Sequence, residues 1–216
     1  MSEARTQVMD AIRANLDPNR GEPSPVTGPA PCTPTGLDTP EDCTARFVEV
    51  LERTGGHLYV VPDEAAATRA LAQIVEKLGA REVALSDAPL VRKLSAGLEG
   101  VETFDGYADR ERLIDCDLGI TAAQKGVAET GTLVLLSASE RHRLTSLVPP
   151  VHVALLEGAD ILPGLGDALA AMRDTSGELP TLVTFITGPS RTGDIELQLV
   201  IGVHGPKELH VILLDR

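Results

Sequence analysis

Apolar residues along this chain recur with two spacings that alternate with each other. A spacing of three to four residues predicts helices over 44–55, 63–80, 89–98 and 109–116. Short aliphatic runs predict strands over 57–61, 82–86, 101–104, 117–121, 132–137, 151–157, 181–186 and 209–215. Helices interleaved with aliphatic strands are typical of a mainly parallel sheet with helices on both faces. The predicted fold class is therefore α/β.

The segment 195–202 fits both patterns. Its apolar residues alternate as in a strand, but two of them also share one helical face. We expect the flanking strands 181–186 and 209–215 to be parallel neighbours, and parallel strands need a crossover that is usually helical. We therefore interpret the segment as a helix, with Asp194 as its N-cap and Gly202 just past its last turn.

The first 40 residues divide into two parts. Residues 1–16 place Val8 and Ile12 on one face of a short amphipathic helix. Residues 17–40 are rich in proline and glycine, which indicates an extended connector. We expect the helix to dock on the domain or on a partner, and residues 41–216 to form a single α/β domain.

Composition limits the binding partners and the cellular location that we expect for this protein. A net charge of -13 and few aromatic residues argue against nucleic acid binding. The N-terminus lacks the apolar core of a secretory signal and no apolar run reaches bilayer length, so we expect a cytoplasmic protein without a transmembrane segment. Cys32, Cys43 and Cys116 are far apart and belong to no metal-ligand motif. We therefore expect no zinc or iron–sulfur site within this chain.

The loop 188–194, with the sequence GPSRTGD, is the first candidate for chemistry. With a strand before it and a helix after it, the loop would lie where open α/β sheets bind ligands. Gly188 permits a close backbone approach, Ser190 and Thr192 add hydroxyl groups, and Arg191 has the planar guanidinium that pairs with a carboxylate or phosphate. The alternative is an ordinary turn with a solvated arginine and a capping aspartate.

A second candidate lies between the strands 117–121 and 132–137. Glu129 in this position has the chemistry of a nucleophile or a general base, and Lys125 that of an anion contact. The alternative is a hairpin-like connection whose charges face water, and we favour this alternative for Lys125.

Three further basic positions remain. The triplet 141–143 is a local positive spot on an acidic chain, and one of its arginines is suited to contact an anion. His152, inside an apolar run, is interpreted as a core histidine. His204 lies in a glycine-flanked turn, where its imidazole either faces a ligand or stabilises the turn by a hydrogen bond.

Four segments together resemble the LUD-domain family in their order, spacing and residue pattern. They are similar above all to the stand-alone members of the lactate utilization protein C type. These segments are 119–137, 141–156, 184–196 and 199–215. The resemblance is dense over the second half of the chain. It implies the fold shared by glucosamine-6-phosphate deaminase, ribose-5-phosphate isomerase and CoA transferases (NagB/RpiA/CoA transferase-like), an α/β sandwich around a mainly parallel sheet.

The resemblance also implies a role in the bacterial oxidation of L-lactate to pyruvate, alongside partner proteins that carry iron–sulfur clusters. No cofactor is expected within this chain. The positions that match the family motif are Glu129, Thr130, Gly131, Arg143, Gly188, Ser190, Arg191, Thr192, Asp194, Glu196, His204 and Gly205. Among these we expect Glu129 and His204 to be catalytic, and the others to bind substrate or shape the backbone.

Several functions remain open at this point. The first is a non-redox subunit or accessory protein of an L-lactate oxidation system, which binds a small carboxylate at the GPSRTGD loop. The second is an independent enzyme, either an acyl-CoA transferase with Glu129 as nucleophile or a sugar-phosphate isomerase. The third is an assembly module without chemistry of its own. Whether the chain is an enzyme is therefore not decided by its sequence.

Overall fold

The computed structural model describes residues 3–15, 36–137, 143–172, 180–192, 200–202 and 204–216. The chain divides into two units, Met1–Pro31 and Cys32–Arg216, which are described separately. In the first unit, helix α1 (Glu3–Asn15) occurs where the sequence predicts an amphipathic helix, and Val8 and Met9 on it are exposed. The predicted domain limits stay a prediction.

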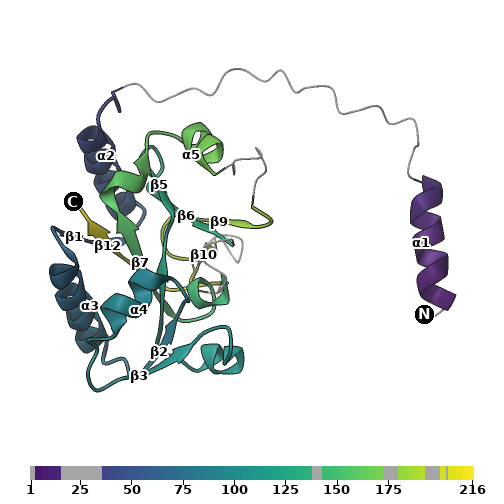
Figure 1. The fold of residues 1–216 in the computed structure, drawn as a ribbon, viewed down its shortest axis with the longest axis horizontal. Helices are drawn as coiled ribbons and strands as arrows, with labels where there is room; N and C mark the ends of the chain where they lie inside the picture. Colours follow the sequence, from purple (N-terminus) through teal and green to yellow (C-terminus); the bar gives the residue numbers. More distant parts are fainter. Residues whose placement is uncertain (1–2, 16–35, 138–142, 173–179, 193–199, 203) are drawn as a thin grey trace. The chain divides into compact units, whose positions relative to one another are not determined.

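The second unit is built on a six-stranded sheet in which every neighbouring pair is parallel (Figure 1). The strand order is β1-β12-β7-β4-β2-β3. In that order the strands are β1 (His57–Val61), β12 (Glu208–Leu214), β7 (Val151–Glu157), β4 (Leu118–Ala122), β2 (Glu82–Leu85) and β3 (Glu102–Asp105). The predicted α/β class with a mainly parallel sheet is confirmed.

Helices lie on both faces of this sheet. On one face, α3 (Glu64–Leu78) and α4 (Pro89–Ser95) bury aliphatic side chains against the central strands. On the other, α2 (Pro40–Arg53) buries Phe47 and Leu51. Local signals set both ends of α3. The Asp63 carboxylate accepts from the N–H of Ala66 at the start of α3, and Gly79 ends α3 with a φ of 63°.

A second, smaller sheet packs beside α2 on the same face. Its strand order is β8-β5-β6-β9, and the pairs β5–β6 and β6–β9 are antiparallel. The strands are β5 (Lys125–Val127), β6 (Thr132–Leu136), β8 (Ile161–Leu162) and β9 (Val183–Ile186). Leu133 and Leu135 of β6 join the core beneath α2, whereas Val134 faces away and packs against α5 (Leu165–Ala171). Because side chains alternate between the two faces of a strand, β6 contributes to a different hydrophobic cluster on each face.

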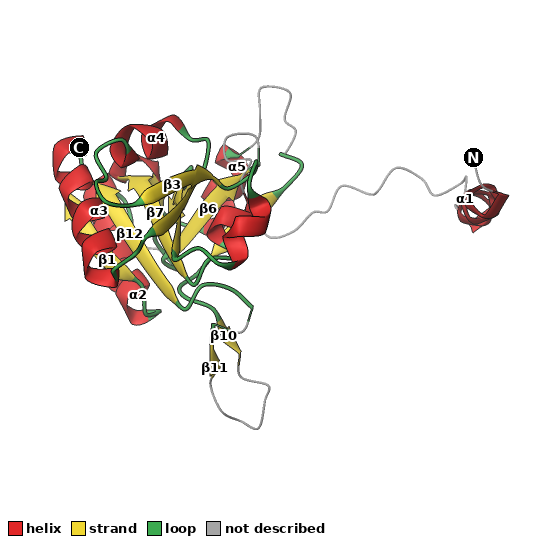
Figure 2. Cartoon of the chain, turned by 90° about the horizontal axis from the view of Figure 1, so that it is seen from below, coloured by secondary structure: helices red, strands yellow, loops and turns green. Residues whose placement is uncertain are grey.

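The observed strand pairing corrects two interpretations from the sequence. The strands 181–186 and 209–215 are not parallel neighbours, because β9 pairs with β6 while β12 lies in the large sheet. Residues 200–202 do not end a helix: β11 (Val200–Ile201) pairs antiparallel with β10 (Arg191–Thr192). The β10–β11 pair extends away from the two sheets (Figure 2). The rest of the predicted helix lies outside the described residues.

The remaining elements are short. Residues expected to form a helix at 109–116 form the 3-10 helix η1 (Arg110–Ile114) instead, and two further 3-10 turns are η2 (Arg143–Ser146) and η3 (Gly158–Asp160). In the part of the chain that the structure describes, no helix has the length and apolar character needed to cross a bilayer.

Candidate functional site

A cavity of about 180 Å³ lies at the amino ends of β7 and β12. The loop that follows β9 and the loop that precedes β12 form its walls, and the end of η2 closes it. The lining residues are Ser146, Leu147, His152, Phe185, Ile186, Thr187, Gly188, Pro189, Ser190, His204, Gly205, Pro206 and Leu209. Four of the predicted site residues, Gly188, Ser190, His204 and Gly205, therefore come together here although they come from two separate segments.

Backbone hydrogen bonds join the two loops. The N–H of Ser190 donates to the carbonyl of Pro206 over 2.8 Å, and the N–H of Gly202 donates to the carbonyl of Ser190 over 3.0 Å. A Cβ atom on Gly205 would lie 3.3 Å from the Cβ of Ser190, closer than most side-chain contacts. The loops are thus held in contact by their main chains, and glycine at 205 leaves room for that contact.

The loop does not occupy the position that the sequence predicts for it. Sequence reasoning placed GPSRTGD beyond the carboxyl ends of parallel strands, ahead of a helix. Because β9 pairs with β6 in the smaller sheet, the loop instead faces His152 and Leu209, which are near the amino ends of their strands. A ligand in this cavity would be bound by side chains and turns. It would not lie at the point where the strand order of a doubly wound sheet reverses.

His152 forms the floor of the cavity. It is 1% exposed, and its Nε2 lies 2.7 Å from the hydroxyl oxygen of Thr121 on β4. Burial, and to a lesser extent the charge of His210, lowers the pKa of His152 to about 3, so its imidazole is neutral near pH 7. Among the described residues, no group forms a hydrogen bond with its Nδ1. This histidine is a core residue, as predicted, but one with a ring nitrogen left for a further partner.

A chain of hydroxyl groups joins the β5–β6 turn to the cavity. The hydroxyl oxygens of Thr130 and Thr132 are 2.7 Å apart, and those of Thr132 and Thr187 are also 2.7 Å apart. Thr187 lines the cavity. Thr130, a predicted substrate contact, therefore connects to the site through two other side chains and does not line it.

Three motif positions meet at the carboxyl end of α2. Gly131 (φ 62°) would place a Cβ 2.6 Å from the backbone nitrogen of Leu51, and Gly188 (φ 78°) would place one 2.8 Å from the carbonyl oxygen of Thr54. The guanidinium of Arg191 donates to that same carbonyl over 2.6 Å. Arg191 was predicted to hold an anion, but in this structure its guanidinium binds the helix end and does not line the cavity.

Glu129 lies in the turn between β5 and β6. It is exposed, and its backbone N–H donates to the carbonyl of Pro163 over 3.0 Å. Its carboxylate is not part of the cavity lining. The neighbouring Lys125 forms an ion pair with Asp160 over 2.6 Å, so this charge is paired within the protein and not simply solvated.

The other predicted contacts are also outside the lining. Arg143 is exposed at the start of η2, and Thr192 pairs with Val200 in the β10–β11 ribbon. Asp194 and Glu196 lie outside the described residues. Sequence analysis did not single out Thr187, and it interpreted His152 as a core histidine without placing it beside the predicted site residues. The signal available for His152 was a histidine within the otherwise aliphatic run 151–157.

The cavity is small, and its lining is short of ionisable side chains. No lysine, arginine, aspartate or glutamate occurs among the described residues that line it. Its polar groups are the imidazoles of His152 and His204, the hydroxyls of three residues, and backbone amides. Pockets for drug-sized ligands have volumes of roughly 300–1,000 Å³. This cavity therefore suits a molecule of a few heavy atoms that is recognised by hydrogen bonds.

A second group of residues has the donor atoms of a metal site. His57, Glu208 and His210 each offer one ligand atom, and these atoms lie within 4.8 Å of one another. They lie on β1 and β12. Sequence analysis did not identify them, because His57 lies on β1 whereas Glu208 and His210 lie on β12, and these strands are far apart in the chain.

Comparison with known proteins places this architecture in a family. The LUD domain family model matches residues 44–214. Lactate utilization protein C of Halalkalibacterium halodurans is 38% identical over 126 residues, and the alignment covers 55% of this chain and 54% of that protein. Lactate utilization protein C of Shouchella clausii is 30% identical over 185 residues, which cover 81% of this chain and 76% of that protein. For several relatives the alignment spans about half of their length.

A solved structure shares the fold. The crystal structure of a DUF162 family protein from Deinococcus radiodurans superposes with a TM-score of 0.62 at 20% identity, covering 81% of this chain and 98% of that one. At this identity the likeness concerns the fold alone. The family model covers most of the chain and agrees with the relatives of the lactate utilization protein C type, and this chain belongs to the LUD-domain family.

Proposed function

We propose that this chain takes part in bacterial lactate utilization as a subunit that binds a small carboxylate, such as lactate or pyruvate, in the cavity between the 188–190 and 204–206 loops. The relatives named lactate utilization protein C support the pathway. One observation supports this site: four predicted site residues line the same small cavity. They are Gly188, Ser190, His204 and Gly205.

Hydrogen-bonding side chains would hold the ligand. The hydroxyl of Ser190 and the imidazole of His204 are suited to bind the carboxylate oxygens. His152, with its Nε2 bonded to Thr121, forms the floor beneath the ligand. In this proposal Arg191 positions the loop through Thr54 and does not touch the ligand.

The electrons of lactate oxidation would pass through partner proteins that carry iron–sulfur clusters. Cys43 and Cys116 are buried in different core clusters, and neither has a part in this proposal. Glu129 has no part in the proposal, because its carboxylate does not line the cavity.

Binding is tested by calorimetric titration of L-lactate, pyruvate and acetate into the full chain. We expect saturable binding of lactate or pyruvate, weakened about tenfold by Ser190→Ala or His204→Ala, since each removes one hydrogen bond to a charged group. His57→Ala, an exposed histidine outside the cavity, is the matched control and should bind as wild type does. No saturable binding, or equal affinity in all variants, would refute this site.

The pathway is tested separately. Extracts of bacteria that lack this chain should lose lactate-dependent dye reduction, and adding back the wild-type protein should restore it. Undiminished activity without the chain would remove the assignment to lactate utilization.

A further inference from the structure

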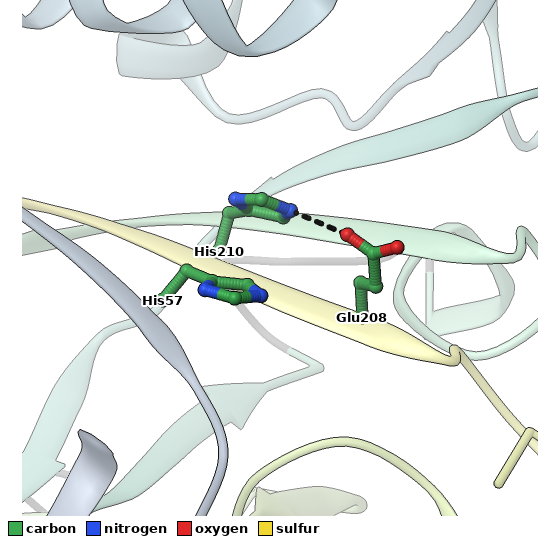
Figure 3. Close-up of side chains that lie close together, drawn as sticks. All are labelled: His57, Glu208 and His210. Atoms are coloured by element: carbon green, nitrogen blue, oxygen red, sulfur yellow. Dashed lines mark hydrogen bonds and ion pairs between the residues drawn. The ribbon is translucent and has the colours of Figure 1, made fainter. Parts of the chain in front are cut away.

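The three residues His57, Glu208 and His210 share one face of the β1–β12 pair (Figure 3). His57 and His210 are register partners on adjacent parallel strands. Glu208 precedes His210 by two residues, so strand alternation directs its side chain to the same face. The sheet register therefore brings together two imidazoles and one carboxylate near the amino end of β12.

The ring of His210 is held in a defined orientation. Its side chain is 3% exposed, its Nε2 lies 3.2 Å from a carboxylate oxygen of Glu208, and its Nδ1 lies 3.3 Å from the hydroxyl of Tyr59. A hydrogen bond from Nδ1–H to the tyrosine oxygen would leave the Nε2 lone pair directed toward Glu208. Histidines that bind metals usually have such a partner on the second nitrogen.

The other two side chains have freedom to complete a coordination shell. The ring of His57 stacks on that of His210, with centroids 4.7 Å apart and planes inclined by 29°. His57 is exposed and the side chain of Glu208 is 46% exposed, so small rotations can direct both donor atoms to one point.

We propose that His57, Glu208 and His210 bind a divalent transition metal ion such as Zn²⁺, with water in the remaining positions. Two imidazoles and a carboxylate are a frequent donor set for zinc and related ions, whereas Mg²⁺ and Ca²⁺ prefer oxygen ligands alone.

This site is separate from the cavity of the proposed function. Leu209 lines the cavity, and its neighbours Glu208 and His210 point to the opposite face of the sheet. A bound ion would join the edge strand β1 to the central strand β12. Metal binding and carboxylate binding are therefore expected to be independent, and metal should raise the melting temperature because it binds only the folded protein.

The test uses the full chain after treatment with a chelator. Zn²⁺ is titrated in competition with a chromophoric chelator, and Co²⁺ absorption reports the ligand types. We expect one ion per chain, with affinity reduced at least about tenfold in His57→Ala and in Glu208→Gln, and reduced to a smaller degree in Tyr59→Phe. His204→Ala removes an exposed histidine from the cavity and should bind Zn²⁺ as wild type does.

Three results would overturn the proposal. They are the lack of saturable Zn²⁺ binding by the wild type, equal affinity in His57→Ala and His204→Ala, and a cobalt spectrum with thiolate charge-transfer bands. Far-UV circular dichroism of each variant shows whether it is folded, and because His57 is exposed, its variant gives a readout that does not depend on core packing.

Discussion

Arg191 donates a hydrogen bond to the backbone carbonyl of Thr54, which lies 137 residues earlier in the chain, over 2.6 Å. Thr54 ends α2, and the carbonyls at a helix end lack partners within the helix and carry partial negative charge. The arginine of the GPSRTGD loop thus satisfies one of these carbonyls. This contact, with the close approach of Gly131 and Gly188, fastens one wall of the cavity to the helix.

Replacing Arg191 with alanine should destabilise the protein modestly. The loss of one charged donor at an exposed site is expected to lower the free energy of unfolding by about 1 kcal/mol, and the melting temperature by about 2–4 °C. Denaturant unfolding measures the change. Arg69→Ala on the exposed surface of α3 is the matched control and should shift stability by less than about 0.5 kcal/mol. Equal effects of the two variants would show that the bond to Thr54 contributes nothing.

Gly131→Ala should lower the free energy of unfolding far more than Gly79→Ala does. The two glycines have nearly the same backbone, with φ values of 62° and 63°, but a Cβ at 131 would meet the backbone of Leu51 at 2.6 Å whereas nothing lies within 4 Å at 79. We expect the free energy of unfolding to fall by about 1 kcal/mol for Gly79→Ala, from backbone strain alone, and by about 3 kcal/mol or more for Gly131→Ala. Similar midpoints in urea for the two variants would contradict the close packing of the β5–β6 turn on α2.

His152 should make stability depend on pH. Burial lowers its pKa to about 3, whereas a histidine in the unfolded chain titrates near a pKa of about 6.5. The unfolded state therefore takes up a proton between these values that the folded state does not. The stabilisation from neutral His152 is complete above the upper value and decreases as pH falls toward the lower one, by up to about 1.4 kcal/mol per pH unit.

The His152→Gln variant tests this dependence. Unfolding by urea at a series of pH values between about 7 and 4.5 should give a shallower decline in stability for His152→Gln than for wild type. Parallel curves for the two proteins would mean that His152 does not carry the effect.

The hydroxyl chain at the β5–β6 turn should contribute to stability through its central member. Thr132 is 5% exposed and lies 2.7 Å from the hydroxyls of both Thr130 and Thr187. Thr132→Val conserves its shape but removes both hydrogen bonds, which should cost about 1–2 kcal/mol. Calorimetric unfolding of Thr132→Val beside Thr103→Val, at an exposed position of β3, checks the expectation. A cost no larger than that of the control would show that the chain of hydroxyls adds no stability.

Several features could be predicted from the sequence because they depend on neighbours along the chain. The caps of α3 at Asp63 and Gly79 and the aliphatic strands of the large sheet are examples. The segment 195–202 shows where that reasoning ends. Its pattern fitted a helix or a strand, and the interpretation rested on the assumption that 181–186 and 209–215 lie side by side. Residues 183–186 instead pair with β6, and so the premise for the helix was wrong.

The alternation of helical and aliphatic segments by itself determined an α/β protein with a mainly parallel sheet, because buried strands and amphipathic helices have different periods. Only the tertiary structure decided which strands share a sheet, that the 188–190 and 204–206 loops meet at His152, that Arg191 binds Thr54, and that His57 lies beside His210. Each of these depends on pairing between residues far apart in the chain. Such pairing follows from the packing of the whole core, and no local pattern encodes it.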